Sequence, residues 1–118
     1  KQNLPWIFAG AVGMQGQVAV ILPGETPCLR CLLDSPPSQC EDSNCVQNGV
    51  FGPAVSVMAS LQAMEAIKFL GGCYRQVSRR MIKIDMWTNE IQQFDMSIEN
   101  RNSRCPCCVL QEFEFLEP

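Results

Sequence analysis

The chain has 118 residues, enough for one domain or part of one. Its net charge of −3 and pI of about 4.8 argue against a nucleic-acid surface, which would normally be basic. The longest apolar stretch, 53–71, contains Gln62, Glu65 and Lys68, whose burial in a bilayer would be costly, so we expect no membrane span. The opening residues do not show the pattern of a signal peptide, so we expect none and a cytoplasmic protein.

The opening residues predict two buried β-strands. Residues 4–13 form an apolar run that ends in glycine, and residues 16–24 carry β-branched side chains between Gly16 and Pro23. The chain therefore starts inside a sheet rather than at the edge of a domain. We expect it to be a fragment whose partner strands lie upstream.

A polar loop and a long helix follow. Residues 34–48 are rich in Pro, Ser and Asp, and loops of this length inside a compact domain are often functional. Pro53 at the first helical position and the pair Gly71-Gly72 as a stop signal predict a helix between them. Its apolar residues occupy more than one face, so we expect it to be buried on most sides, against a sheet or a partner subunit.

The remaining residues predict a hairpin and a tail. Apolar and polar residues alternate on both sides of Thr88-Asn89, which marks the turn. The inward residues would be Ile82 with Ile84, and Phe94 with Met96, in a register that the pattern leaves open. The tail, 109–118, is expected to be an added edge strand or a flexible end.

The cysteines are the residues of this chain that most clearly indicate a chemical role. It contains 8 cysteines and no histidine, so it cannot assemble a Ser-His-Asp or Cys-His catalytic pair by itself. Two C-x-x-C pairs, "CLRC" at 28–31 and "CPCC" at 105–108, have the spacing that metal knuckles use. Nothing indicates secretion, so the pattern favours a metal site over a disulfide framework.

We expect Cys28 and Cys31 to form one knuckle of a structural zinc site and Cys105 and Cys108 to form the other. Four thiolates close such a site, so it would not be catalytic. Cys107 offers an alternative partner for Cys105, and iron is an alternative ion because thiolate tetrads also bind it.

Three further cysteines remain, and Cys45 is the candidate for a reactive thiol. Cys73 follows a helix end and is expected to be an ordinary thiol. Cys40 and Cys45 lie in the polar loop, where a nucleophile would be accessible. Cys45 also leads toward the amino end of the long helix, which lowers the pKa of a thiol and increases the fraction of thiolate.

The motifs taken together resemble a known family. The segments "GQVAVILPGETPCLRCLL", "NCVQNGVFGPAVSVMASLQAMEAIKFLGG" and "IKIDMWTNEIQQFDMSIENRNSRCPCC" look like the carboxy-terminal half of the ThiF/MoeB/HesA family, the bacterial relatives of ubiquitin-activating enzymes. The resemblance runs in order over residues 5–108. Residues 1–118 would then be the C-terminal half of an adenylation domain whose N-terminal, ATP-binding half is absent.

The resemblance implies a Rossmann-like α/β fold and an ATP- and Mg²⁺-dependent adenylyltransferase as the full-length parent. Such an enzyme activates the C-terminal glycine of a ubiquitin-like sulfur-carrier protein. Residues 34–48 would be the crossover loop over the carrier's tail. Cys45 matches the position of the family's thioester or persulfide cysteine, and the four knuckle cysteines match its zinc ligands. A homodimer is also implied.

One departure limits what this chain can do alone. No G-x-G-x-x-G follows a strand, and no P-loop is present, so the chain offers no recognisable donors for nucleotide phosphates. We therefore expect the fragment to be inactive without its missing half.

Two other functions are compatible with the sequence. In the first, the chain is a noncatalytic zinc-stabilised module that binds a ubiquitin-like or other protein. In the second, the chain is a thiol–disulfide relay, although neither cysteine pair follows the βαβ pattern of thioredoxin-like proteins.

Overall fold

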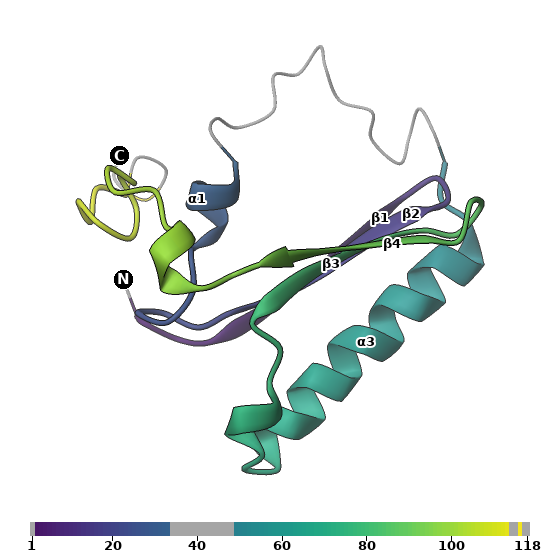
Figure 1. Ribbon diagram of the computed structural model, residues 1–118, viewed down its shortest axis with the longest axis horizontal. Coiled ribbons are helices and arrows are strands. Elements are labelled where there is room, and N and C mark those ends of the chain that lie inside the picture. Colours follow the sequence, from purple (N-terminus) through teal and green to yellow (C-terminus); the bar gives the residue numbers. More distant parts are fainter. Residues whose placement is uncertain (1, 34–48, 114–115, 117–118) are drawn as a thin grey trace.

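The computed structural model describes residues 2–33, 49–113 and 116. One four-stranded sheet has α3 on one side and the single-turn helix α1 on the other (Figure 1). The elements in chain order are β1 (Trp6–Val12), β2 (Gln15–Ile21), α1 (Leu29–Leu32), α3 (Gly52–Leu70), the 3-10 turn η1 (Tyr74–Gln76), β3 (Arg80–Asp85), β4 (Glu90–Asp95) and the 3-10 turn η2 (Ile98–Asn100).

The sheet has the order β1-β2-β3-β4, and every strand pair in the described residues is antiparallel. The predicted opening strands and the hairpin at Thr88-Asn89 are both confirmed. Asn89 has a φ of 58°, a left-handed conformation that asparagine tolerates in place of the usual glycine. The parallel part of a Rossmann-like sheet is not among these strands.

Strand β2 forms the centre of the core because both of its faces are covered. Val20 and Leu22 pack with Val77 on the side of α3, whereas Ala19 and Ile21 pack with Met96 on the side of α1. A strand that is buried on both faces has no polar positions to alternate with. This explains the uninterrupted apolar run in the second half of β2.

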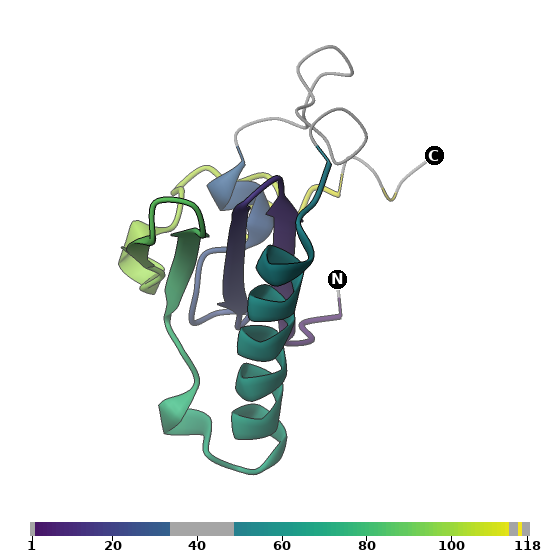
Figure 2. The ribbon, with the colours of Figure 1, turned by 90° about the vertical axis from the view of Figure 1, so that its right-hand side faces the viewer.

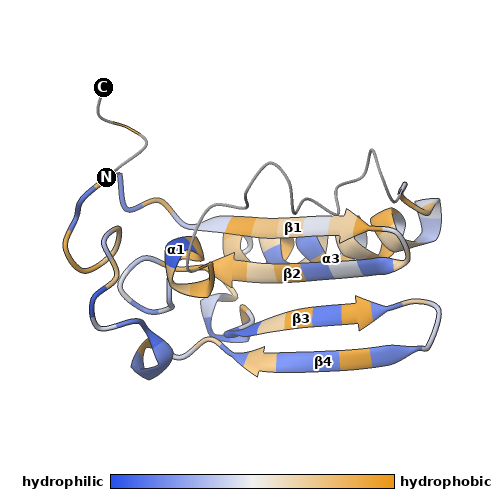
Figure 3. Ribbon diagram, turned by 90° about the horizontal axis from the view of Figure 1, so that it is seen from above, coloured by the Kyte–Doolittle hydropathy of each residue, from blue (hydrophilic) through white to orange (hydrophobic). Residues whose placement is uncertain are grey.

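Helix α3 lies on β1 and β2 rather than on the β3–β4 hairpin (Figures 2 and 3). The helix approaches so closely that a Cβ atom on Gly16 would stand 2.4 Å from Cγ of Met58. Only Ala54 and Met58 of α3 are fully buried.

Within the described residues of this single chain, α3 is therefore buried on one side only, and the predicted cover by a partner subunit stays a prediction. Ile67 and Leu70 are 64% and 83% exposed, because no described element lies on the outer side of the helix.

The β3–β4 hairpin also differs from the predicted set of inward residues. Ile82 pairs with Val18, so Ile82 and Ile84 face α3. Phe94 pairs with Met81 on the opposite face, where Met96 joins the core cluster. The two predicted pairs thus point to opposite sides of the sheet.

The chain returns to the sheet just before α3. Gly13 donates its N–H to the carbonyl of Gly49 at 2.9 Å and accepts the N–H of Phe51 at 3.0 Å. These bonds attach the start of α3 to the β1–β2 turn. Within residues 2–33, 49–113 and 116, no helix combines the length and apolar character that crossing a bilayer requires.

Candidate metal centre

Two tight turns from distant parts of the chain present the knuckle cysteines. Cys28 immediately precedes α1, and the N–H of Cys31 bonds to the carbonyl of Cys28 at 3.0 Å. In the second turn the N–H of Cys105 bonds to the carbonyl of Asn102 at 3.1 Å. Cys105 is fully buried, and the other three thiols are partly buried.

The four sulfur atoms gather in one cluster, with all of them within 4.8 Å of one another. Across the two segments, Sγ of Cys28 lies 3.6 Å from Sγ of Cys105, and Sγ of Cys31 lies 3.4 Å from Sγ of Cys108. Within the first pair, the Sγ–Sγ distance between Cys28 and Cys31 is 3.8 Å. A tetrahedral zinc site with Zn–S bonds of about 2.3 Å has S–S edges of about 3.8 Å, so the donor set fits such an ion.

Hydrogen bonds and burial act differently on the thiols of the cluster. Burial opposes ionisation of Cys105, but bonds from the Cys108 backbone N–H and from neighbouring thiols outweigh it and lower the pKa of Cys105 to about 7. Burial, followed by the neighbouring thiols, raises the pKa of Cys108. A cation among the sulfur atoms would favour the thiolate form of the thiols whose ionisation burial opposes.

The other cysteines lie apart from this cluster or outside the described residues. Cys107 is not in the group, although it lies between two of its members in sequence. Cys73 is exposed and follows α3. Cys40 and the predicted reactive Cys45 fall in 34–48, outside the described residues, so the structure does not test either one.

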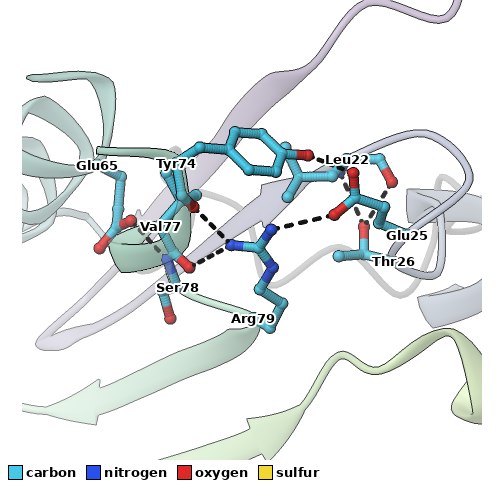
Figure 4. Close-up of polar contacts among 8 residues, drawn as sticks. All are labelled: Leu22, Glu25, Thr26, Glu65, Tyr74, Val77, Ser78 and Arg79. Atoms are coloured by element: carbon cyan, nitrogen blue, oxygen red, sulfur yellow. Dashed lines mark hydrogen bonds and ion pairs between the residues drawn. The ribbon is translucent and has the colours of Figure 1, made fainter. Parts of the chain in front are cut away.

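A polar network that the sequence pattern does not indicate lies beside the first turn. Glu25 accepts hydrogen bonds from Tyr74 and Arg79, which lie in and after η1 (Figure 4). Glu25 is separated from these partners by 49 and 54 positions, so no local motif indicates the contact.

The sheet face that carries α1 has a second feature, a wide hollow of about 720 Å³ near the β1–β2 turn. Gly10 leaves its floor open, and Gln15, Gln17, Lys83, Asp85 and Trp87 supply its polar and aromatic walls. Asp85 accepts a 2.8 Å hydrogen bond from Gln15. That bond, followed by bonds from the N–H groups of Thr88 and Trp87, lowers the pKa of Asp85.

The described residues thus form a mixed α/β unit with four clustered cysteines at one end of its sheet. The ThiF family model matches residues 1–107, nearly the whole chain. The chain belongs to the ThiF family.

The curated relatives agree with this assignment. The chain is 32% identical to the sulfur carrier protein ThiS adenylyltransferase of Bacillus subtilis, over 98% of this chain and 33% of that protein. It is 39% identical to the Escherichia coli protein of the same name, over 90% of this chain and 40% of that protein. The adenylyltransferase and sulfurtransferase MOCS3 of Oryza sativa is 33% identical over 90% of this chain. The chain thus spans 33% and 40% of the lengths of the first two relatives.

Solved structures of E. coli MccB share the fold. The complex of MccB with ATP superposes with a TM-score of 0.65 at 27% identity, and covers 90% of this chain and 32% of that protein. The complex with MccA-N7isoASN gives a TM-score of 0.67 at 24% identity, with 91% of this chain and 33% of that protein covered.

We expect purified protein to contain close to one metal ion per chain, because the four thiols fit a single tetrahedral ion. Cys105→Ser should lose most of this metal, since it removes the fully buried ligand. Elemental analysis by inductively coupled plasma mass spectrometry gives the stoichiometry.

Cys107→Ser is the matched control, because it removes a neighbouring thiol that lies outside the cluster. It should keep the metal. Loss of metal from Cys107→Ser, with retention in Cys108→Ser, would show that the second knuckle is Cys105 with Cys107.

Proposed function

We propose that this chain is the rear part of an ATP-dependent adenylyltransferase that activates the C-terminal glycine of a ubiquitin-like sulfur-carrier protein. The observation that carries the proposal is the match over 90% or more of the chain to two relatives named ThiS adenylyltransferases. The parent joins the carrier carboxylate to AMP and releases pyrophosphate. ATP and Mg²⁺ bind the parent's other half, because this sequence contains no glycine fingerprint for phosphates.

In this proposal the described part contributes a rigid platform rather than the nucleotide site. The carrier approaches the sheet face opposite α3, where the hollow beside Gly10 admits an extended, glycine-rich tail. Lys83 is the cation among the lining residues and supplies a partner for the tail's carboxylate or carbonyl groups. The exposed indole of Trp87, 76% accessible, supplies apolar contact area at its rim.

Zinc is the ion that we propose for the four-cysteine cluster. The absence of histidine and the four clustered sulfurs both favour a closed thiolate site, which leaves no open position for substrate. The ion's role is therefore structural, and no reaction step passes through it. Retention of free thiols in such a site also agrees with a reducing compartment, which we propose to be the cytoplasm.

Cys45 is proposed to accept the activated carrier. Its thiolate attacks the acyl-adenylate, a thioester bond forms, and AMP leaves. This proposal rests on the sequence position of Cys45, upstream of the amino end of α3, because residues 34–48 lie outside the described part.

We further propose that the parent is a homodimer. The resemblance to the family supports this proposal. Several apolar side chains of α3 are 46–83% exposed and would be covered by a second subunit or by the parent's other half, namely Val55, Met64, Ile67 and Leu70.

The activity has a direct assay in the full-length parent. Incubation with ATP, labelled pyrophosphate and candidate sulfur carriers should give carrier-dependent ATP–pyrophosphate exchange, because adenylation is reversible. A carrier that lacks its terminal glycine should give none. Absence of exchange with every carrier tested would contradict the activity and leave a metal-stabilised binding module as the better interpretation.

Replacement of Cys45 separates adenylation from thioester formation. Cys45→Ala in the parent should abolish the enzyme–carrier thioester, which added thiol cleaves by exchange, while leaving pyrophosphate exchange within about twofold of wild type. Cys40→Ala is the matched control from the same loop and should keep the adduct. An adduct that survives in Cys45→Ala and is lost in Cys40→Ala would move the role to Cys40.

Light scattering of the purified parent measures its molar mass in solution. We expect twice the mass of one chain, because the apolar face of α3 favours association. A monomeric mass at micromolar concentration would contradict the homodimer.

A further inference from the structure

Arg79 connects the two segments that carry the metal-binding cysteines. Its Nη2 donates to Oε2 of Glu25 at 3.0 Å, in the turn that ends just before Cys28. Its backbone carbonyl accepts the N–H of Met96 at 2.8 Å, at the start of the segment that leads to Cys105. One residue therefore holds both segments at the end of the sheet where they approach each other.

The Arg79 side chain is fixed much more firmly than an ordinary surface arginine. Its Nη1 donates to the carbonyls of Tyr74 and Val77, at 3.0 and 2.8 Å. The guanidinium also lies over the Tyr74 ring, 4.9 Å from its centroid. The Tyr74 hydroxyl donates to Oε1 of the same Glu25 carboxylate (Figure 4). Isolated surface ion pairs contribute little, whereas a shared network with fixed geometry contributes more.

The backbone between Glu25 and Cys28, the first cysteine, is short and held by hydrogen bonds. The N–H groups of Glu25 and Thr26 both bond to the carbonyl of Leu22 at 2.9 Å, and Thr26 Oγ1 accepts the N–H of Leu22 at 2.9 Å. Thr26 and Pro27 are buried, and the proline ring fixes the backbone that enters Cys28. A displacement of the Glu25 turn is therefore passed on to the first knuckle.

The segment that leads to the Cys105–Cys108 turn begins in the core. Met96 is 1% exposed and packs with Ala19 and Ile21, and Leu32 of α1 packs against the same cluster. Leu32 directly follows Cys31, so both cysteine segments contact this cluster on the same face of the sheet. The bond from Met96 to Arg79 thus fixes the second segment against the first.

We infer that Glu25, Tyr74 and Arg79 are positioning residues of the metal centre: they hold the Cys28–Cys31 turn in register with the Cys105–Cys108 turn and so increase the affinity of the four-thiol cluster for its ion. They do not touch the thiols. The Tyr74 hydroxyl, and then Arg79, lower the pKa of Glu25, so the carboxylate stays charged at neutral pH. This inference rests on the proposed metal site.

The test compares two adjacent arginines. Arg79→Gln removes the guanidinium that bonds to Glu25, Tyr74 and Val77. Arg80→Gln removes an exposed side chain that bonds to Gln93 at 2.9 Å and does not reach the Glu25 turn. Zinc affinity is measured for each purified protein by competition with a chromophoric chelator. We expect Arg79→Gln to bind zinc about tenfold more weakly than wild type, and Arg80→Gln to match wild type within twofold. Circular dichroism of the zinc-loaded proteins checks that both variants are folded.

Further variants keep the inference testable if Arg79→Gln fails to fold. Tyr74→Phe removes one hydrogen bond to Glu25 and should weaken zinc binding severalfold. The double variant Tyr74→Phe/Glu25→Gln should bind zinc no more weakly than Glu25→Gln alone, because both changes act through the same network. Folded Arg79→Gln or Tyr74→Phe with wild-type affinity would overturn the positioning role. A wild-type protein that binds no zinc would overturn the metal site itself, so the two failures are distinguishable.

Discussion

The close approach of four cysteine sulfurs is the contact on which the rest of this structure depends. Each contact between the two segments joins residues 77 positions apart, and the sheet and α3 lie between them in sequence. In the loop-closure description, a metal ion that joined the two segments over that distance would remove about 4.5 kcal/mol of chain entropy from the unfolded state. The core beneath the cluster is small and centres on β2, so this link matters more here than it would in a larger domain.

The fold organises the two faces of the sheet for different purposes. On one face, α3 packs along β1 and β2 and leaves its outer apolar side without cover from the described residues. On the other face, the thiol cluster and α1 occupy one end of β2, and an open hollow with mixed polar and apolar lining occupies the other. In the proposed function, the first face contacts protein in the parent, and the second is the surface proposed for the tail of the carrier.

Local patterns in the sequence predicted the features that depend only on the spacing of residues along the chain. The C-x-x-C pairs, the helix between Pro53 and Gly71, and the hairpin at Thr88-Asn89 are all of this kind, and the structure contains each of them. The faces of the hairpin could not be predicted, because a shift of one residue reverses every side chain in a strand. The exposure of α3 and the Arg79 network depend on which distant elements meet, and composition or periodicity does not encode that. The role of Cys45 stays a prediction.

X-ray absorption at the zinc edge tests the central claim most directly, because it measures the ligands of the ion inside the intact protein. The account predicts a single shell of four sulfur atoms at about 2.3 Å from zinc. A shell that contains oxygen or nitrogen ligands, or protein whose Cys28, Cys31, Cys105 and Cys108 are joined as disulfides and hold no zinc, would contradict it.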